Sequence, residues 1–121
     1  MKRLTGAAVA MGLATAVPVP ARAQFYTGNE IYGDCQASES DAAYFQKWAR
    51  CTSYVTGAFD AILLARQLND KPDCTPDRLT VGQMRDVAVK YMREHPENRN
   101  MSAAAIVLLS IMDAWPCGSG K

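Results

Sequence analysis

The clearest pattern in the chain is a run of apolar side chains at spacings of three and four residues between positions 41 and 69. This spacing puts them on one face of a helix and predicts a long helix from about Asp41 to Asn69. The opposite side carries Ser53, Gly57 and Ala61, small residues that predict close approach of another helix, from the same chain or from a second copy. At 1.5 Å per residue this helix would be about 43 Å long, which favours a kink near Gly57 or a later start. The apolar positions are Tyr44, Trp48, Cys51, Val55, Ala58, Phe59, Ile62 and Ala65.

Two capping boxes predict the starts of shorter helices. Thr27 and Glu30 have the spacing of this motif and predict a helix over about 28–37. Thr80 and Gln83 repeat it and predict a second start.

Prolines and apolar runs define the rest of the fold. The helix that begins after Thr80 is expected to end at His95, because a residue before proline is pushed out of helical geometry. Two prolines make 69–80 a loop. The segment from about Ser102 to Trp115 is apolar on almost all sides and is expected to be buried. No segment predicts a strand, so we expect an all-α fold: a small bundle of four or five helices, held together by two disulfides.

Residues 1–23 have the pattern of an export signal. Lys2 and Arg3 precede an apolar stretch from Leu4 to Val17, and Ala21-Arg22-Ala23 fits a cleavage site. Cleavage after Ala23 would leave residues 24–121 as a single domain in the periplasm. The alternative is an uncleaved membrane anchor, but this stretch is shorter than the about 20 apolar residues that span a bilayer.

Four cysteines follow the predicted signal, namely Cys35, Cys51, Cys74 and Cys117. An even number of cysteines in an exported chain predicts two disulfides, although four cysteines allow three pairings. Short connections between antiparallel helices favour Cys35–Cys51 with Cys74–Cys117. A zinc site is the alternative, but the cysteines lack the close pairs that are typical of zinc ligands.

Charge and chemistry exclude several classes of function. Removal of the signal would leave 10 basic and 12 acidic residues, a net charge of about −2, with no basic run for nucleic acid. His95 is the only imidazole, and no free thiol is expected to act with it as a nucleophile. Asp34 and Asp60 could in principle work as a pair of carboxylates, but Asp60 projects from the side of the long helix opposite its apolar stripe, and the sequence has no cluster of metal ligands. We therefore expect no catalytic residue, no metal and no cofactor, and a binding protein rather than an enzyme.

An ordered set of short motifs resembles a known family. They are Gly28-Asn29-Glu30-Ile31-Tyr32-Gly33-Asp34-Cys35-Gln36, Cys51-x-x-Tyr54-Val55-x-Gly57-x-x-Asp60-Ala61, Cys74-x-Pro76, Thr80-Val81-Gly82-Gln83, Val89-Lys90-Tyr91, His95-Pro96 and Ala114-Trp115-Pro116-Cys117. Together they resemble the Rap/Tai family of immunity proteins, which protect bacteria against amidase effectors of type VI secretion. The resemblance implies a periplasmic, disulfide-bonded homodimer that covers the active site of a cell-wall amidase. It also implies structural roles for Tyr54, Gly57, Asp60, Trp115 and Pro116 besides the cysteines.

Two polar connections are the candidate partner-binding surfaces. One is the turn over 94–100, with Glu94, His95, Glu97, Asn98 and Arg99, and the other is the loop over 69–78. Both are equally compatible with ordinary solvated connections. The alternative function is a general periplasmic helper or an acid-stress chaperone without a toxin partner.

Overall fold

The structure, a computed structural model, describes residues 25–118, and the predicted export signal lies outside them. The predicted all-α class is confirmed, since the described part contains helices and one isolated bridge between Thr27 and Ser102, but no strand. The elements are α1 (Gly28–Cys35), α2 (Tyr44–Leu68), α3 (Val81–Glu94), the 3-10 helix η1 (Pro96–Asn98) and α4 (Ala103–Ala114).

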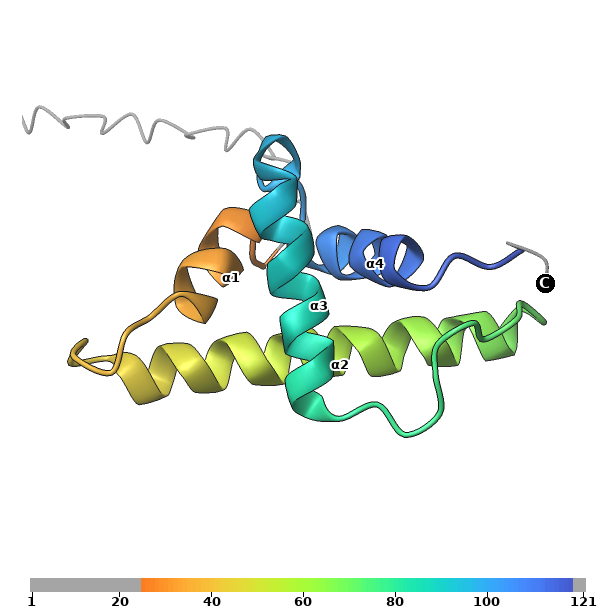
Figure 1. The fold of residues 1–121 in the computed structure, drawn as a ribbon, viewed down its shortest axis with the longest axis horizontal. Coiled ribbons are helices and arrows are strands. Elements are labelled where there is room, and N and C mark those ends of the chain that lie inside the picture. Colours follow the sequence, from red (N-terminus) through yellow and green to blue (C-terminus); the bar gives the residue numbers. More distant parts are fainter. Residues whose placement is uncertain (1–24, 119–121) are drawn as a thin grey trace, which may run out of the picture.

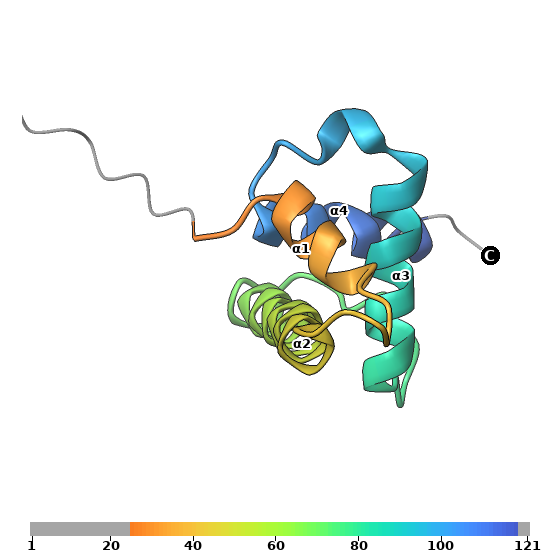
Figure 2. The same cartoon turned by 90° about the vertical axis from the view of Figure 1, so that its left-hand side faces the viewer.

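The long helix α2 forms the base of the fold. In Figure 1, α1 and α4 lie above α2 on opposite sides of α3, and α3 crosses α2 steeply. The view along α2 in Figure 2 shows α1 and α4 on one side of it and α3 on another. The helices thus cross each other rather than lying side by side as antiparallel neighbours. With 25 residues, α2 extends at both ends beyond the helices that cover it.

Local sequence explains where the helices begin. Both predicted capping boxes are present: the Glu30 amide donates to Thr27 Oγ1 at 3.3 Å, and the Gln83 amide donates to Thr80 Oγ1 at 3.2 Å. Each satisfies amides that the first turn of a helix leaves unpaired. The long helix begins three residues later than predicted, because Asp41 Oδ1 accepts a hydrogen bond from the Ala43 amide in a turn before it.

The core lies where the four helices meet. Cys51, Val55 and Phe59 of the predicted stripe are buried there, and α1, α3 and α4 contribute the other side chains. These include Ile31, Ala88, Tyr91, Met92, Ala103, Ile106, Val107 and Ile111.

The sequence analysis was wrong about several apolar positions. Trp48 and Ala65 lie on the predicted core stripe but are exposed. Both lie toward the ends of α2, where no helix covers it. The expectation that α4 is buried all round is also wrong, because Leu108 and Met112 face solvent.

Both predicted disulfides are confirmed. Cys35–Cys51 joins the end of α1 to α2, with Cα atoms 5.2 Å apart, and the Cys51 side chain is buried. Cys74–Cys117 joins the loop after α2 to the segment after α4, with Cα atoms 5.5 Å apart. All four cysteines are therefore oxidised, which removes the zinc alternative.

An ion pair reinforces the contact between α1 and α2. Asp34 is buried on α1, and both of its carboxylate oxygens accept hydrogen bonds from the Arg50 guanidinium, the Nη2 contact being 2.7 Å. This pairing with Asp34 raises the pKa of Arg50. Because a buried carboxylate is costly without a partner, the pair fixes α1 against α2.

Candidate functional site

The end of α3 and the turn that follows it hold all five predicted partner-binding residues, with Glu94 as the last residue of the helix, but the five differ in exposure. Glu94 is exposed and accepts a hydrogen bond from Lys90 Nζ at 2.8 Å. Glu97 is also exposed, and its carboxylate lies 3.1 Å from Nδ1 of His95. The His95 ring packs on the ring of Tyr91, with centroids 4.4 Å apart. These three side chains form a polar surface at the outer edge of the turn.

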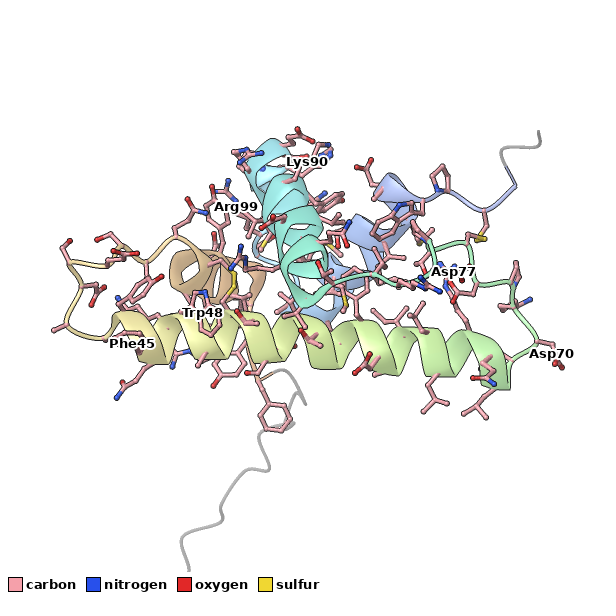
Figure 3. The ribbon with its side chains drawn as sticks, turned by 60° about the horizontal axis from the view of Figure 1, so that its bottom comes forward. Phe45, Trp48, Asp70, Asp77, Lys90 and Arg99 are labelled. Atoms are coloured by element: carbon pink, nitrogen blue, oxygen red, sulfur yellow. A yellow bond between two sulfur atoms is a disulfide. The ribbon has the colours of Figure 1, made fainter. Side chains whose placement is uncertain are left out.

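The other two predicted residues point back into the fold. Asn98 Nδ2 donates to the Tyr91 hydroxyl at 3.0 Å. Arg99 Nε donates to the carbonyl of Met92 at 2.5 Å, and its guanidinium lies 3.9 Å above the centroid of the Tyr32 ring. Arg99 therefore connects the turn to α1 and α3, and Figure 3 shows it between these helices. Reversing its charge would disturb the fold as well as any interface.

A glycine allows α1 to lie against this turn. A Cβ atom on Gly28 would come within 2.9 Å of both the carbonyl oxygen of Arg99 and a side-chain carbon of Ile106. The amides of Gly28 and Asn29 donate to the carbonyls of Met101 and Arg99 at 2.9 and 2.7 Å. The close approach requires glycine and holds the turn in one position relative to α1.

The carboxylates on the outer edge of the turn are stabilised in their ionised form. The hydrogen bond from Lys90 lowers the pKa of Glu94. The backbone amide of Glu97 and then the His95 ring lower the pKa of Glu97. Glu94 and Glu97 are therefore ionised at neutral pH, and the cations of Lys90 and Arg93 lie near Glu94.

The second predicted surface, the loop over 69–78, is braced from inside. Asp73 Oδ1 accepts hydrogen bonds from the amide and the hydroxyl of Thr75, at 3.0 and 2.7 Å, and the side-chain hydrogen bond is the main cause that lowers the pKa of Asp73. Arg66 of α2 donates to the carbonyl of Pro72 and lies 3.3 Å from the sulfur of Cys117. With the Cys74–Cys117 disulfide, these contacts hold an exposed loop in a defined shape.

The residues that the family resemblance marked as structural fall into two groups. Tyr54 packs edge-to-face on Tyr26 at 5.5 Å, and burial raises its pKa. Trp115 packs edge-to-face on Phe59 at 6.3 Å, beside the core. Pro116 follows Trp115 and is exposed.

Gly57 and Asp60 lie on the solvent side of α2 instead. A Cβ atom on Gly57 would meet no atom within 4 Å, so no helix of the described part approaches it. The expectation that Gly57 makes room for a helix of the same chain is therefore wrong for the described residues.

The sequence analysis missed a third surface, at the N-terminal end of α2. Tyr44, Phe45 and Trp48 line a hollow there with Glu39, and Phe45 is 81% exposed. Figure 3 shows Phe45 and Trp48 at this end and Asp70 beyond the other end. Two of these aromatic residues were placed in the core stripe, because periodicity does not report that a helix extends beyond its neighbours. The signal available in the sequence was Phe45, an apolar residue that lies outside that stripe.

The described residues contain no group of three or more side chains suited to hold a metal ion. Among these residues, no helix is both long enough and apolar enough to cross a membrane.

Comparison with known proteins identifies the family. The family model described as Rap1a immunity proteins matches residues 27–117, which include all four helices and both disulfides. No curated protein and no solved structure matches the chain. Two disulfides and an immunity-protein fold indicate a secreted or periplasmic protein that acts on a protein partner, a secreted effector. The chain belongs to the family of Rap1a immunity proteins.

Proposed function

We propose that this protein is a periplasmic immunity protein that binds a peptidoglycan amidase delivered by type VI secretion and occludes its active site. The family match over 27–117 carries the proposal. The export pattern of residues 1–23 supports a periplasmic location, which is the compartment where a cell-wall amidase acts. We assign the protein no enzymatic activity of its own, because immunity by occlusion requires only binding.

The polar turn after α3 is the first candidate for contact with the effector. Its outer edge presents Glu94, His95 and Glu97 on a backbone that is fixed by Arg99 and by the amides of α1. A fixed loop loses little conformational entropy on binding, and the exposed Glu97 carboxylate offers an acceptor for a donor or a cation of the partner. Glu97 is the best probe, since its substitution leaves the internal contacts of Asn98 and Arg99 intact.

We also propose that the protein is a homodimer that uses the solvent side of α2. Gly57 is open there, and Ser53 and Ala61 lie one turn away on either side. Leu64 and Leu68 continue this face as exposed apolar side chains. Light scattering after gel filtration should give twice the chain mass for the wild type and one chain mass for Gly57→Arg. Equal masses for the wild type and for Gly57→Arg would show that this face is not the dimer interface.

The function is tested by producing the protein together with the product of its neighbouring reading frame. The neighbour, exported alone to a bacterial periplasm, should lyse the cells, and turbidity should be restored only when this protein is exported as well. A version without residues 1–23 is the matched control and should not protect. Lysis that continues despite export would contradict the proposal.

A further inference from the structure

The hollow at the N-terminal end of α2 has the composition of a site for a cation. It is lined by Glu39, Tyr44, Phe45 and Trp48, and has a volume of about 610 Å³. This volume lies within the range of about 300–1,000 Å³ that is typical of ligand pockets. Phe45 and Trp48 are 81% and 45% exposed, so their rings are open to a partner. We call these four residues the aromatic hollow.

The charge of the aromatic hollow favours a positive group. The faces of aromatic rings carry negative potential and attract cations. Glu39 adds a carboxylate, which has no ion-pair partner within the described residues 25–118. The two cations in the first turns of α2 are already engaged, because Lys47 pairs with Asp41 at 2.5 Å and Arg50 pairs with Asp34.

Elsewhere in this protein, two arginine side chains are held by the same residue types. The Arg50 guanidinium pairs with the Asp34 carboxylate and lies 5.9 Å from the centroid of the Tyr26 ring. Arg99 lies 3.9 Å above the ring of Tyr32. The aromatic hollow repeats the combination of a carboxylate and aromatic rings, but without a guanidinium of this chain.

The helix dipole at the start of α2 does not strongly repel a cation in the aromatic hollow. The N-terminal end of a helix carries partial positive charge. Here the Asp41 carboxylate accepts a hydrogen bond from the Ala43 amide at 2.8 Å, which places a negative charge at this end. The amide of Tyr44 donates to the carbonyl of Asp41 at 2.9 Å, so it is also satisfied.

We propose that the aromatic hollow binds an arginine side chain of the protein partner, and this rests on the proposed function in taking that partner to be the effector. A planar guanidinium can stack on the Trp48 indole and donate two hydrogen bonds to the Glu39 carboxylate at the same time. A lysine ammonium is a compact, strongly hydrated charge and cannot form both contacts in this way. Tyrosine, tryptophan and arginine are also the residue types that contribute most to protein interfaces.

The test needs no effector. The chain has two tryptophans, so the oxidised protein labelled at the indole nitrogens gives two signals, and Trp115 beside the core serves as the internal control. The probes are the tripeptides acetyl-Gly-Arg-Gly-amide and acetyl-Gly-citrulline-Gly-amide, which differ in charge at almost equal shape. We expect the arginine peptide to move the Trp48 signal in a saturable manner, and the citrulline peptide to bind at least severalfold more weakly. Glu39→Gln and Phe45→Leu should each weaken binding by about two- to fivefold, as for exposed cation–π and ion-pair contacts.

Several results would overturn the proposal. Equal shifts with both peptides, an unmoved Trp48 signal, or tighter binding of the matching lysine peptide would each contradict a guanidinium site. A Trp48 shift that depends on protein concentration alone would assign the hollow to contact with a second copy. An unchanged Trp115 signal in each variant shows that the fold is intact. Because the titration contains no toxin, failure of the immunity test leaves its result standing, and failure of the titration leaves the immunity proposal standing.

Discussion

The two disulfides lie toward opposite ends of α2, in different surroundings. Near its start, Cys35–Cys51 lies beside the core and is reinforced by the buried Asp34 carboxylate. Beyond its end, Cys74–Cys117 lies at the surface, and Leu68 at the last turn of α2 is 75% exposed. The first disulfide adds to a contact between helices that already bury apolar surface. The second holds a loop that has no such packing, so it determines the shape of a surface rather than the core.

Removal of each disulfide is expected to have the largest effect on stability. For loops of 16 and 43 residues, the chain-entropy model gives about 3 and about 4 kcal/mol. The Cys35→Ala/Cys51→Ala protein also loses the packing of the buried Cys51 side chain. Urea unfolding should therefore show a loss of about 3–4 kcal/mol for either double variant. A loss below about 1 kcal/mol for the Cys74→Ala/Cys117→Ala protein would mean that the loop is held by other contacts.

The order in which the two disulfides are reduced should also distinguish the buried from the surface disulfide. Mild treatment with dithiothreitol, followed by alkylation and mass spectrometry, should label Cys74 and Cys117 first, because Cys117 is exposed and Cys51 is 1% exposed. Earlier labelling of Cys35 and Cys51 would reverse the assignment of the buried and the surface disulfide.

Truncation of an apolar side chain should affect the free energy of unfolding differently at the two ends of α2. Ile31→Ala removes a fully buried side chain of α1 and should cost about 2–5 kcal/mol. In the Gly57→Arg background, which should be monomeric, Leu68→Ala at the exposed end is the matched control and should change the free energy of unfolding by less than about 0.5 kcal/mol. A similar loss for both variants in that background would show that the far end of α2 is packed within one chain.

The ion pair at the packed end should contribute less than the buried apolar contact. Asp34→Asn keeps the shape of a buried side chain but removes its charge toward Arg50, and should lower the melting temperature. Asp86→Asn, at the exposed pair with Arg85, is the control and should leave the melting temperature nearly unchanged. Equal effects of the two substitutions on the melting temperature would mean that the Asp34–Arg50 pair does not help to hold α1 against α2.

The smallest expected effect is on pH dependence at the start of α1. Hydrogen bonds from Thr27 lower the pKa of Glu30 in the folded protein. Since the folded pKa is below the unfolded value near 4.5, this contribution is complete above pH 4.5 and is lost as the pH falls through the folded pKa. Glu30→Gln should reduce the slope of unfolding free energy with pH in this window by up to about one proton. An unchanged slope would mean that the capping box is not formed in solution.

Short-range features of the sequence predicted most of the fold. Capping boxes, prolines and cysteine spacing act within a few residues or through simple connections, so they located the starts of α1 and α3, the loop over 69–80 and both disulfides. Exposure depends on which helices cover which turns. Periodicity therefore placed Trp48 in the core, although α2 extends beyond its neighbours there.

The candidate site was predicted less completely for the same reason. The turn over 94–100 was located correctly by its polar residues and Pro96. The inward contacts of Arg99 with Met92 and Tyr32 depend on where α1 packs, which no local pattern reports. The aromatic hollow likewise appears only when the end of α2 is seen to be uncovered.

The most direct test of the proposed function is inhibition of the neighbour-encoded enzyme by the purified oxidised protein. Release of peptides from isolated peptidoglycan should fall to background as this protein is added, with the break at one chain per enzyme. The Glu97→Lys protein should require a higher concentration for the same inhibition while keeping its melting temperature. Undiminished peptide release in the presence of excess wild-type protein would contradict occlusion of an amidase active site.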